Sequence, residues 1–176
     1  MNPAVNLFAV IAALQGSPNV VRFVDRESGR LVAVDLELYR AAKTKRSGGE
    51  DLAETGSQDL ELARTIVADK GRRFVIGPGP ADFPEYRAMQ DYIASLTDRT
   101  LAFDLAQAVK ARGAFRKFKE TLDQLGMRHD WLAFRDRALD RCAREWIAKR
   151  QFALDETPLP PKPRRTQMRW SSGRPF

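Results

Sequence analysis

The last third of the chain is a long run of helical periodicity that two glycines divide. Apolar residues recur every three to four positions from residue 97 to about 152, which is the spacing of one helix face. Gly113 and Gly126 interrupt this run, and glycine is a frequent helix end. The sequence therefore predicts three consecutive helices, over residues 98–112 with Thr97 as the cap, 114–125, and 130–152 with Asp130 at the start.

The first half of the chain carries strand signals instead. The stretch "NVVRFVDRESGRLVAVDLELY" at residues 19–39 has two β-rich runs around Gly29, where a turn needs a positive φ, so it predicts a β-hairpin. Residues 72–77 predict another strand, which ends in a proline-rich turn. Residues 58–71 predict a helix, and a further helix follows Asp82 as N-cap with Pro84 in its first turn. The segment 7–14 predicts a short helix or strand on the core.

Together these patterns predict an α+β fold. A small antiparallel sheet, made of the hairpin and the strand near 72–77, packs with about five helices, and the C-terminal three form a helical layer. With 43% hydrophobic and 30% charged residues, the composition is that of a globular chain. We expect a single domain over residues 1–155, with a flexible loop at 43–57 and a disordered, basic, proline-rich tail at 156–176.

The net charge of +7 is unevenly distributed. Residues 1–100 carry 13 Lys or Arg against 14 Asp or Glu, whereas residues 101–176 carry 17 against 9. Such an excess in one half favours an anionic partner, and RNA or DNA is the commonest. No apolar run approaches the roughly 20 residues of a membrane helix. The single Cys142 suits a reducing compartment, so we expect a cytoplasmic protein with no membrane partner.

The stretch "ARGAFRKFKETLDQLG" at residues 111–126 interleaves aromatic and basic residues. It suggests either a surface that grips a nucleic acid or an ordinary amphipathic helix. At 100° per residue, Phe115 and Phe118 fall in one sector with Leu122 and Leu125. Aromatic residues that stack on bases must be exposed beside cations. The periodicity therefore favours the amphipathic helix, with Phe115 and Phe118 in the core.

The following helix carries a basic stripe, because Arg137, Arg141 and Arg144 recur at helical spacing. The stripe could track phosphates, or it could be a solvated face that pairs with Asp140 and its neighbours. Arg135 falls inside the apolar sector, where its stem can lie along the core or its guanidinium can meet a carboxylate, Asp136 and Glu145 being local candidates. The candidate nucleic-acid contacts are Arg112, Arg116, Lys117, Arg137, Arg141, Arg144, Arg164 and Arg165.

Five short motifs resemble the bacterial uncharacterised-protein family of the UPF 0158 type. They are a "D-x-x-[ST]-G" turn at 25–29, "M-x-D/E-[FY]-I" at 89–93, "G-[AR]-F-R-x-F-K" at 113–119, "W-x-x-F-[KR]-D" at 131–136 and "A-x-E-W-[LI]" at 143–147. The resemblance spans roughly residues 19–148, and Gln90 and the long 43–57 loop depart from it. It implies a small α+β domain, and it assigns no activity and no catalytic residue.

The sequence shows no signature of catalysis, of a metal site or of a cofactor. One cysteine, Cys142, and one histidine, His129, cannot build a zinc site. We therefore expect a non-enzymatic binding or regulatory protein whose basic C-terminal half contacts nucleic acid. Two alternatives remain. The proline-rich tail or a sheet edge could dock a protein partner, or an unrecognised enzyme site could use Arg135, Asp136, Asp91 and Tyr92.

Overall fold

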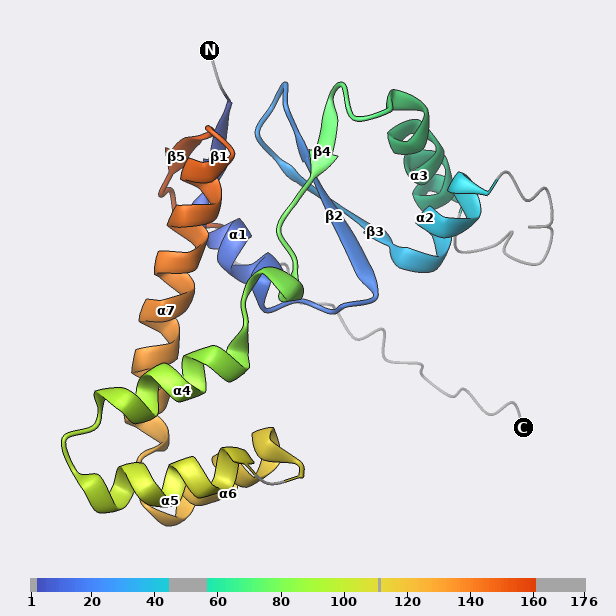
Figure 1. Ribbon diagram of the computed structural model, residues 1–176. Coiled ribbons are helices and arrows are strands. Elements are labelled where there is room, and N and C mark those ends of the chain that lie inside the picture. The colour runs from blue at the N-terminus through green and yellow to red at the C-terminus, as the bar shows by residue number, and fades with distance from the viewer. Residues whose placement is uncertain (1–2, 45–56, 111, 161–176) are drawn as a thin grey trace, which may run out of the picture.

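A computed structural model of the protein describes residues 3–44, 57–110 and 112–160 (Figure 1). The predicted α+β class is confirmed. Most of the loop predicted at 43–57 and of the tail predicted at 156–176 lies outside the described residues. The elements are β1 (Ala4–Asn6), α1 (Leu7–Leu14), β2 (Val20–Asp25), β3 (Leu31–Asp35), α2 (Leu36–Lys43), α3 (Ser57–Asp69), β4 (Phe74–Ile76), the short 3-10 turn η2 (Pro80–Asp82), α4 (Glu85–Ser95), α5 (Arg99–Lys110), α6 (Ala114–Gln124), α7 (Arg128–Lys149) and β5 (Ala153–Asp155).

The predicted hairpin is the centre of the larger sheet. β2 pairs antiparallel with β3 on one side and with β4 on the other, so the strand order is β3-β2-β4. Gly29 has the expected positive φ, 72°. A Cβ on Gly29 would also lie 1.9 Å from the Ala4 carbonyl oxygen, so both the turn and the neighbouring strand β1 require a glycine there.

An ion pair between the buried Asp25 and the half-exposed Arg73 fastens the hairpin turn to the residue before β4. The carboxylate of Asp25, which is only 5% exposed, accepts two hydrogen bonds of 2.8 Å from the guanidinium of Arg73. It also accepts from the Glu27 amide and the Ser28 hydroxyl. The Arg73 hydrogen bonds are the main reason why the pKa of Asp25 lies well below its ordinary value. The turn that precedes Gly29 is thus held as a charged, fully hydrogen-bonded unit.

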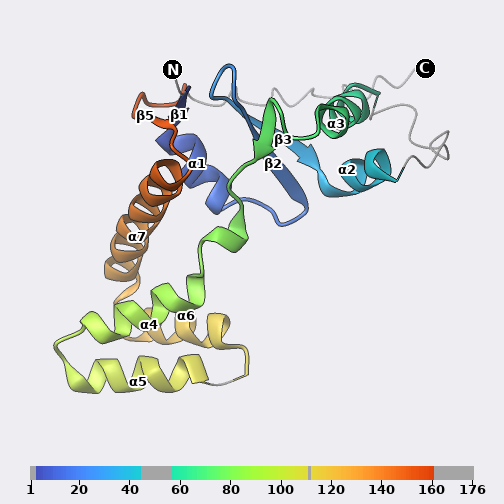
Figure 2. The same cartoon turned by 45° about the horizontal axis from the view of Figure 1, so that its top comes forward.

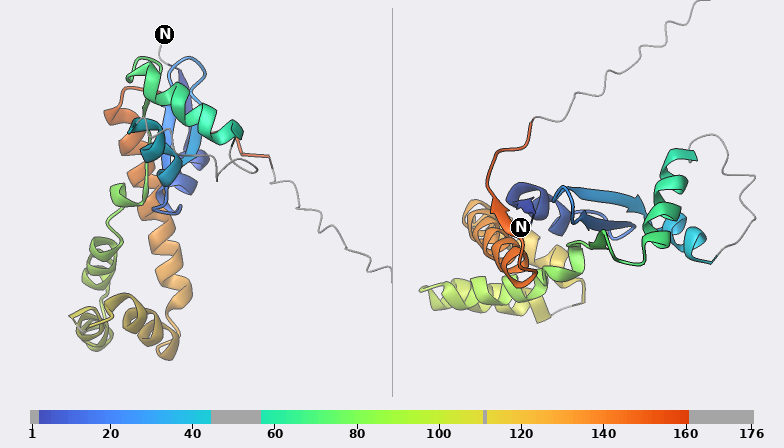
Figure 3. Two further views of the ribbon diagram at one scale, coloured as in Figure 1. Left: turned by 90° about the vertical axis from the view of Figure 1, so that its right-hand side faces the viewer. Right: turned by 90° about the horizontal axis from the view of Figure 1, so that it is seen from above.

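The two faces of the sheet carry different layers because successive strand residues point to opposite sides. Phe23 packs on the side of α2 and α3, in a small cluster with Val34, Ala63 and Ile66. Its neighbour Val24 faces the main core, which α1 and α7 help to form. Figure 3 shows this arrangement from above, with the sheet between α7 and α1 on one side and α2 and α3 on the other.

The other end of the molecule is all helical. α4 crosses α7 near the beginning of that helix (Figure 2). α5 and α6 form an antiparallel hairpin, which lies below α4 in Figure 1. Tyr92, Phe118, Trp131 and Phe134 join α4, α6 and α7 in one aromatic cluster. Tyr92 lies 5.3 Å from both Trp131 and Phe134, and Phe118 lies 5.0 Å from Trp131, between ring centroids. Three of the motifs quoted above therefore meet in the core.

The first and last described strands pair with each other and join the two ends of the described chain. β1 pairs in parallel with β5, across almost 150 residues of sequence. Asn6 strengthens the connection, because its Oδ1 accepts from the Ala9 amide and caps α1, while its Nδ2 donates to Asp155 and to the Thr157 carbonyl. Neither of these two strands was predicted from the sequence.

Several local predictions were wrong. The hairpin was predicted to continue to residue 39, but β3 ends at Asp35 and α2 follows it. Asp35 caps this helix by accepting from the amides of Glu37 and Leu38. The described residues contain seven α-helices where about five were expected. Asp82 does not cap α4, since its carboxylate accepts from the Gly79 amide and Pro84 precedes the helix. Asp98, and not Thr97, caps α5.

Other predictions were close. The segment 7–14 is a helix packed on the core, and α7 begins two residues before Asp130. Gly113 and Gly126 both separate helices, with φ of 79° and 68°. No helix in the described part of the chain has the length and apolar character that crossing a membrane requires.

Candidate nucleic-acid interface

The turn between α5 and α6 forms the free end of the helical hairpin. Gly113 stands in the left-handed region there, and its carbonyl accepts hydrogen bonds from the amides of Arg116 and Lys117 at 3.0 and 3.1 Å. These bonds start α6 immediately after the turn. Both Figure 1 and Figure 2 show that this end of the hairpin points away from α7. Side chains on the first turn of α6 are therefore presented outward.

Charge of one sign is concentrated at this turn. No Asp or Glu occurs between Asp104 and Glu120 in the sequence. Over the same stretch the structure exposes five cations, and we call them, together with Phe115, the basic tip. These cations are Lys110, Arg112, Arg116, Lys117 and Lys119.

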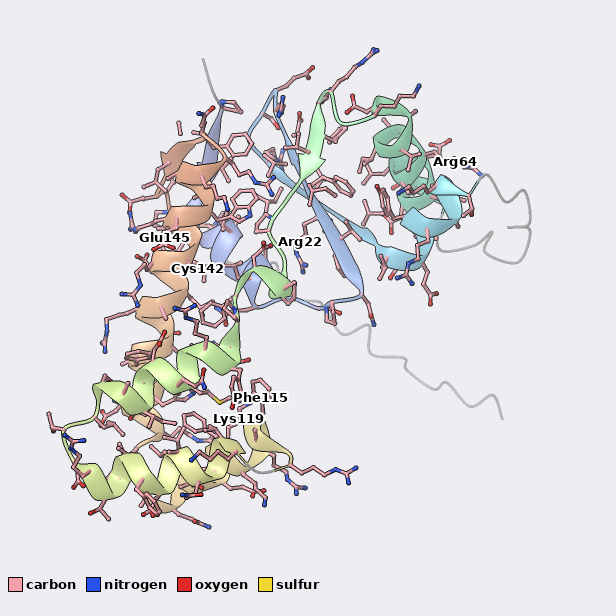
Figure 4. The ribbon with its side chains drawn as sticks, viewed as in Figure 1. Arg22, Arg64, Phe115, Lys119, Cys142 and Glu145 are labelled. Carbon is pink, nitrogen blue, oxygen red and sulfur yellow. The ribbon has the colours of Figure 1, made fainter. Side chains whose placement is uncertain are left out.

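Phe115 was expected in the core, and this expectation was wrong. Its side chain is 45% exposed, whereas Phe118 is 1% exposed. Phe118 packs edge-on against Tyr92 and Trp131, but none of the ring contacts of the described residues involves Phe115. Phe115 and Lys119 lie one turn apart on α6, next to each other in Figure 4. The exposed ring with cations around it is the arrangement that stacking on a base requires.

The cations of the basic tip differ in their partners. Arg116 approaches Glu120 at 3.5 Å, but both side chains are well exposed, so this pair contributes little. Lys117 lines a shallow groove that also contains Asp104 and Glu120, whose carboxylates offset its charge. Lys110, Arg112 and Lys119 form no ion pair within the described residues. These three cations and Arg116 are the ones open to a phosphate.

The basic stripe predicted on α7 is interrupted. Arg144 donates to Asp140 at 2.8 Å and also pairs with Glu156. These two carboxylates, Asp140 first, raise the pKa of Arg144 above its ordinary value. The pairing with Asp140 is the one that the solvated-face interpretation predicts. Arg137 and Arg141 remain exposed, without an ion pair to any described residue.

The α6 and α7 cations do not form one surface. Arg116 lies at the end of α6 that is remote from α7, about 12 Å from the other end at 1.5 Å per residue. Arg137 and Arg141 lie about 13 and 20 Å along the axis of α7 from Arg128, the first residue of that helix. The candidates Arg164 and Arg165 lie outside the described residues.

Arg135 joins three elements of the fold. Its Nε donates to Glu85 on α4 at 3.0 Å and its Nη1 donates to the Gln15 side chain at 3.3 Å. The guanidinium also lies over the Phe83 ring at 5.9 Å. The partner is therefore Glu85, not Asp136 or Glu145 as the sequence suggested, and the role that these contacts give Arg135 is structural.

The residues considered for an enzyme site are not brought together. Tyr92 is buried in the aromatic cluster, while Asp91 and Asp136 are exposed. Among the described residues, no hydrogen bond or ion pair joins any of them to Arg135 or to one another. Burial raises the pKa of the Cys142 thiol, so the thiolate is disfavoured. The described residues contain no group of His, Cys, Asp and Glu that could hold a metal ion.

Of the basic tip, Arg112, Arg116 and Lys117 were predicted contacts, whereas Lys110, Lys119 and the exposed ring of Phe115 were not. A signal for Lys110 and Lys119 was present, because both lie in the stretch without acids between Asp104 and Glu120. Comparison of the chain with family models, curated proteins and solved structures gives no match.

Proposed function

We propose that this protein binds single-stranded nucleic acid through the basic tip, without catalysing a reaction. The observation that carries the proposal is the 45% exposed ring of Phe115 among cations of the α5–α6 turn. A base can stack on the ring while Arg112, Arg116 and Lys119 contact the phosphates on either side. Stacking is tolerant of base identity, so this contact gives affinity with little sequence preference.

A single strand fits the tip better than a duplex. The bases of a duplex are already stacked on one another, and the ring of Phe115 would have no free base to cover. Both RNA and DNA offer a flexible strand with a charged backbone. The proposal includes both, and a cytoplasmic location accompanies it, supported by the single free thiol of Cys142.

Other cations can extend the contact. Arg137 and Arg141, which are exposed on α7, offer further phosphate contacts to which a bound strand can extend. Arg164 and Arg165 belong to the same proposal as part of the basic tail. In this arrangement the ring anchors one base and the remaining cations follow the backbone.

The salt dependence of binding tests the proposal. We measure the fluorescence anisotropy of a labelled single-stranded oligonucleotide with the full chain at several salt concentrations. If Lys110, Arg112, Arg116 and Lys119 each neutralise one phosphate, the slope of log K against log salt is about −3, which is about 50-fold between 50 and 200 mM salt. The double variant Arg112→Gln, Lys119→Gln reduces the slope by about 1.4.

The matched control removes the same charge elsewhere. The double variant Arg40→Gln, Arg64→Gln has the same net charge and leaves every proposed contact in place, because both arginines lie exposed on α2 and α3 at the sheet end, so it should retain the slope of the wild type. A chain that does not bind the oligonucleotide at the lowest salt contradicts the proposal. A partner protein that is captured by the chain and remains after nuclease treatment then favours the protein-interaction alternative.

A further inference from the structure

A cleft lies at the other end of the molecule, on the α2 and α3 side of the sheet. A cleft of about 480 Å³ opens between α2, α3, the edge strand β4 and Arg150, which directly follows α7. Cavities that hold small molecules commonly measure about 300 to 1,000 Å³. The basic tip contributes no residue to this cleft, so the two sites are independent.

The charge of the cleft is entirely positive. Lys43, Lys70 and Arg150 line it, and none of its lining residues is an acid. Lys43 and Lys70 form no ion pair with any described residue. Arg150 is held in place, since its Nη1 donates to the Ile76 carbonyl at 3.0 Å and its guanidinium lies over the Trp146 ring at 5.0 Å. Three cations along one cleft fit a ligand that carries more than one negative charge, as a phosphate does.

The floor of the cleft is apolar and partly aromatic. Phe23 and Ile66 form its buried base. The ring of Tyr39 tilts against Phe23 with 5.3 Å between centroids, and Phe74 is half-buried beside them. Ile76 is 52% exposed at the rim. A flat ring can lie on such a floor, because aromatic faces stack in offset or edge-on geometries.

The backbone around the cleft is strained at a cationic position. In the described part of the chain, the non-glycine residues with positive φ are Lys70, at 53°, and Gln151, at 59°. Lys70 lines the cleft and Gln151 directly follows Arg150. The left-handed region favours glycine, so a lysine there is a conformational cost to the fold. Strained residues of this kind concentrate at ligand sites, where the side chain is needed.

We propose that the cleft binds a small molecule that joins a phosphate to a flat ring, the chemistry of a nucleoside monophosphate. Lys43, Lys70 and Arg150 receive the phosphate. The ring lies on Tyr39, Phe74 and the apolar floor. Neither half alone matches the cleft, because a bare phosphate leaves the apolar floor uncovered and a neutral nucleoside leaves the cations without a partner.

Isothermal titration calorimetry of the full chain with each of the four ribonucleoside monophosphates tests the proposal. At least one of them should bind with a Kd below about 1 mM. The corresponding nucleoside and inorganic phosphate should each bind at least tenfold more weakly. Laurate, which joins a carboxylate to a flexible chain, should not compete. The proposal is overturned if none of the four nucleotides binds, or if laurate binds and they do not.

Three variants locate the site. Arg150→Gln and Lys70→Gly should each weaken nucleotide binding at least tenfold, and Lys70→Gly should keep or raise the melting temperature because glycine relieves the strained backbone. Lys149→Gln is the matched control, since it removes the same charge one residue from Arg150 without lining the cleft. Retained binding in both test variants overturns the assignment. Phe115→Ala should leave nucleotide binding unchanged, which separates this proposal from that of the basic tip.

Discussion

At the scale of single residues, the Asp25–Arg73 pair shows how one buried charge organises a turn. Asp25 is among the few polar side chains buried in the described core, and four donors surround its carboxylate. A buried charge without such partners would destabilise the fold. The turn, β2 and β4 are thus connected through one side chain, and this connection holds the edge strand that borders the cleft.

Replacing Asp25 tests this connection. Asp25→Asn exchanges a carboxylate acceptor for an amide and should lower the free energy of unfolding by about 2 kcal/mol at neutral pH. Glu27→Gln is the matched control, because Glu27 also pairs with Arg73 but is exposed, and it should cost less than about 0.5 kcal/mol. Urea unfolding of the three proteins measures both differences. An equal loss in the two variants would contradict the buried role of Asp25.

The same pair predicts a pH dependence. The pKa of Asp25 is lowered in the folded state, so its contribution to stability is fully present above the ordinary carboxyl pKa of about 4. It is lost as the pH falls below that value toward the lowered pKa. Urea unfolding at several pH values should therefore show the difference between wild type and Asp25→Asn narrowing in acid. If the stability difference between the two proteins grew as the pH fell, the pKa of Asp25 would not be lowered in the folded state.

At the scale of helices and strands, the start of α5 has a different cap from the one predicted. The sequence predicted Thr97, and the structure shows Asp98. Asp98 accepts from the amides of Thr100 and Leu101 at 2.8 and 3.2 Å, while Thr97 lies one residue outside. Asp98→Ala should therefore lower the free energy of unfolding by about 1 kcal/mol, and Thr97→Ala should change it little. Thermal unfolding of both variants decides between the two caps, and the reverse order would contradict the structure.

Periodicity identified the elements that bury a continuous face and missed those that do not. The hairpin and the three C-terminal helices have regular apolar spacing, and glycines mark their ends. α2 was missed because the apolar run of β3 continues directly into it, and only Asp35 marks the boundary. β1 and β5 are three residues each, and their partners are too distant in sequence to leave a local signal.

The candidate site was only partly predictable for a related reason. Periodicity places Phe115 and Phe118 in the same sector of α6, but it does not say how far along the helix the covering surface extends. Phe118 meets Tyr92 and Trp131, whereas Phe115 lies in the first turn, at the free end of the hairpin. A core residue and an exposed ring therefore gave the same signal in the sequence.

At the scale of the whole molecule, Asn6 joins the two ends of the described domain. It caps α1 and donates to the carboxylate of Asp155, the last residue of β5, and to the carbonyl of Thr157 just beyond it. Asn6→Ala should lower the free energy of unfolding by about 1 to 2 kcal/mol and speed hydrogen exchange in β1 and β5 together. Asn19→Ala is the control, since the described bonds of Asn19 use its backbone. Faster exchange in β1 alone would contradict the shared role.

The molecule as a whole carries two different positively charged surfaces, one at each end. The all-helical end presents the basic tip, and the sheet end holds the cationic cleft. Both are exposed and positively charged, but one presents a ring outward and the other encloses an apolar floor. Within the described residues, the cations of the basic tip and those of the cleft therefore lie on two separate surfaces.

The most direct test of the central claim compares two exposed phenylalanines on the same hairpin. Phe115 lies in the basic tip, and Phe103, 62% exposed, lies beside Asp104 about 10 Å along α5 from Lys110. Because both rings are exposed, either can be replaced by alanine without creating a cavity in the core. Phe115→Ala should weaken single-stranded oligonucleotide binding in the anisotropy assay by about 5- to 150-fold, and Phe103→Ala should leave it unchanged. Equal affinities for Phe115→Ala and the wild type would contradict the claim.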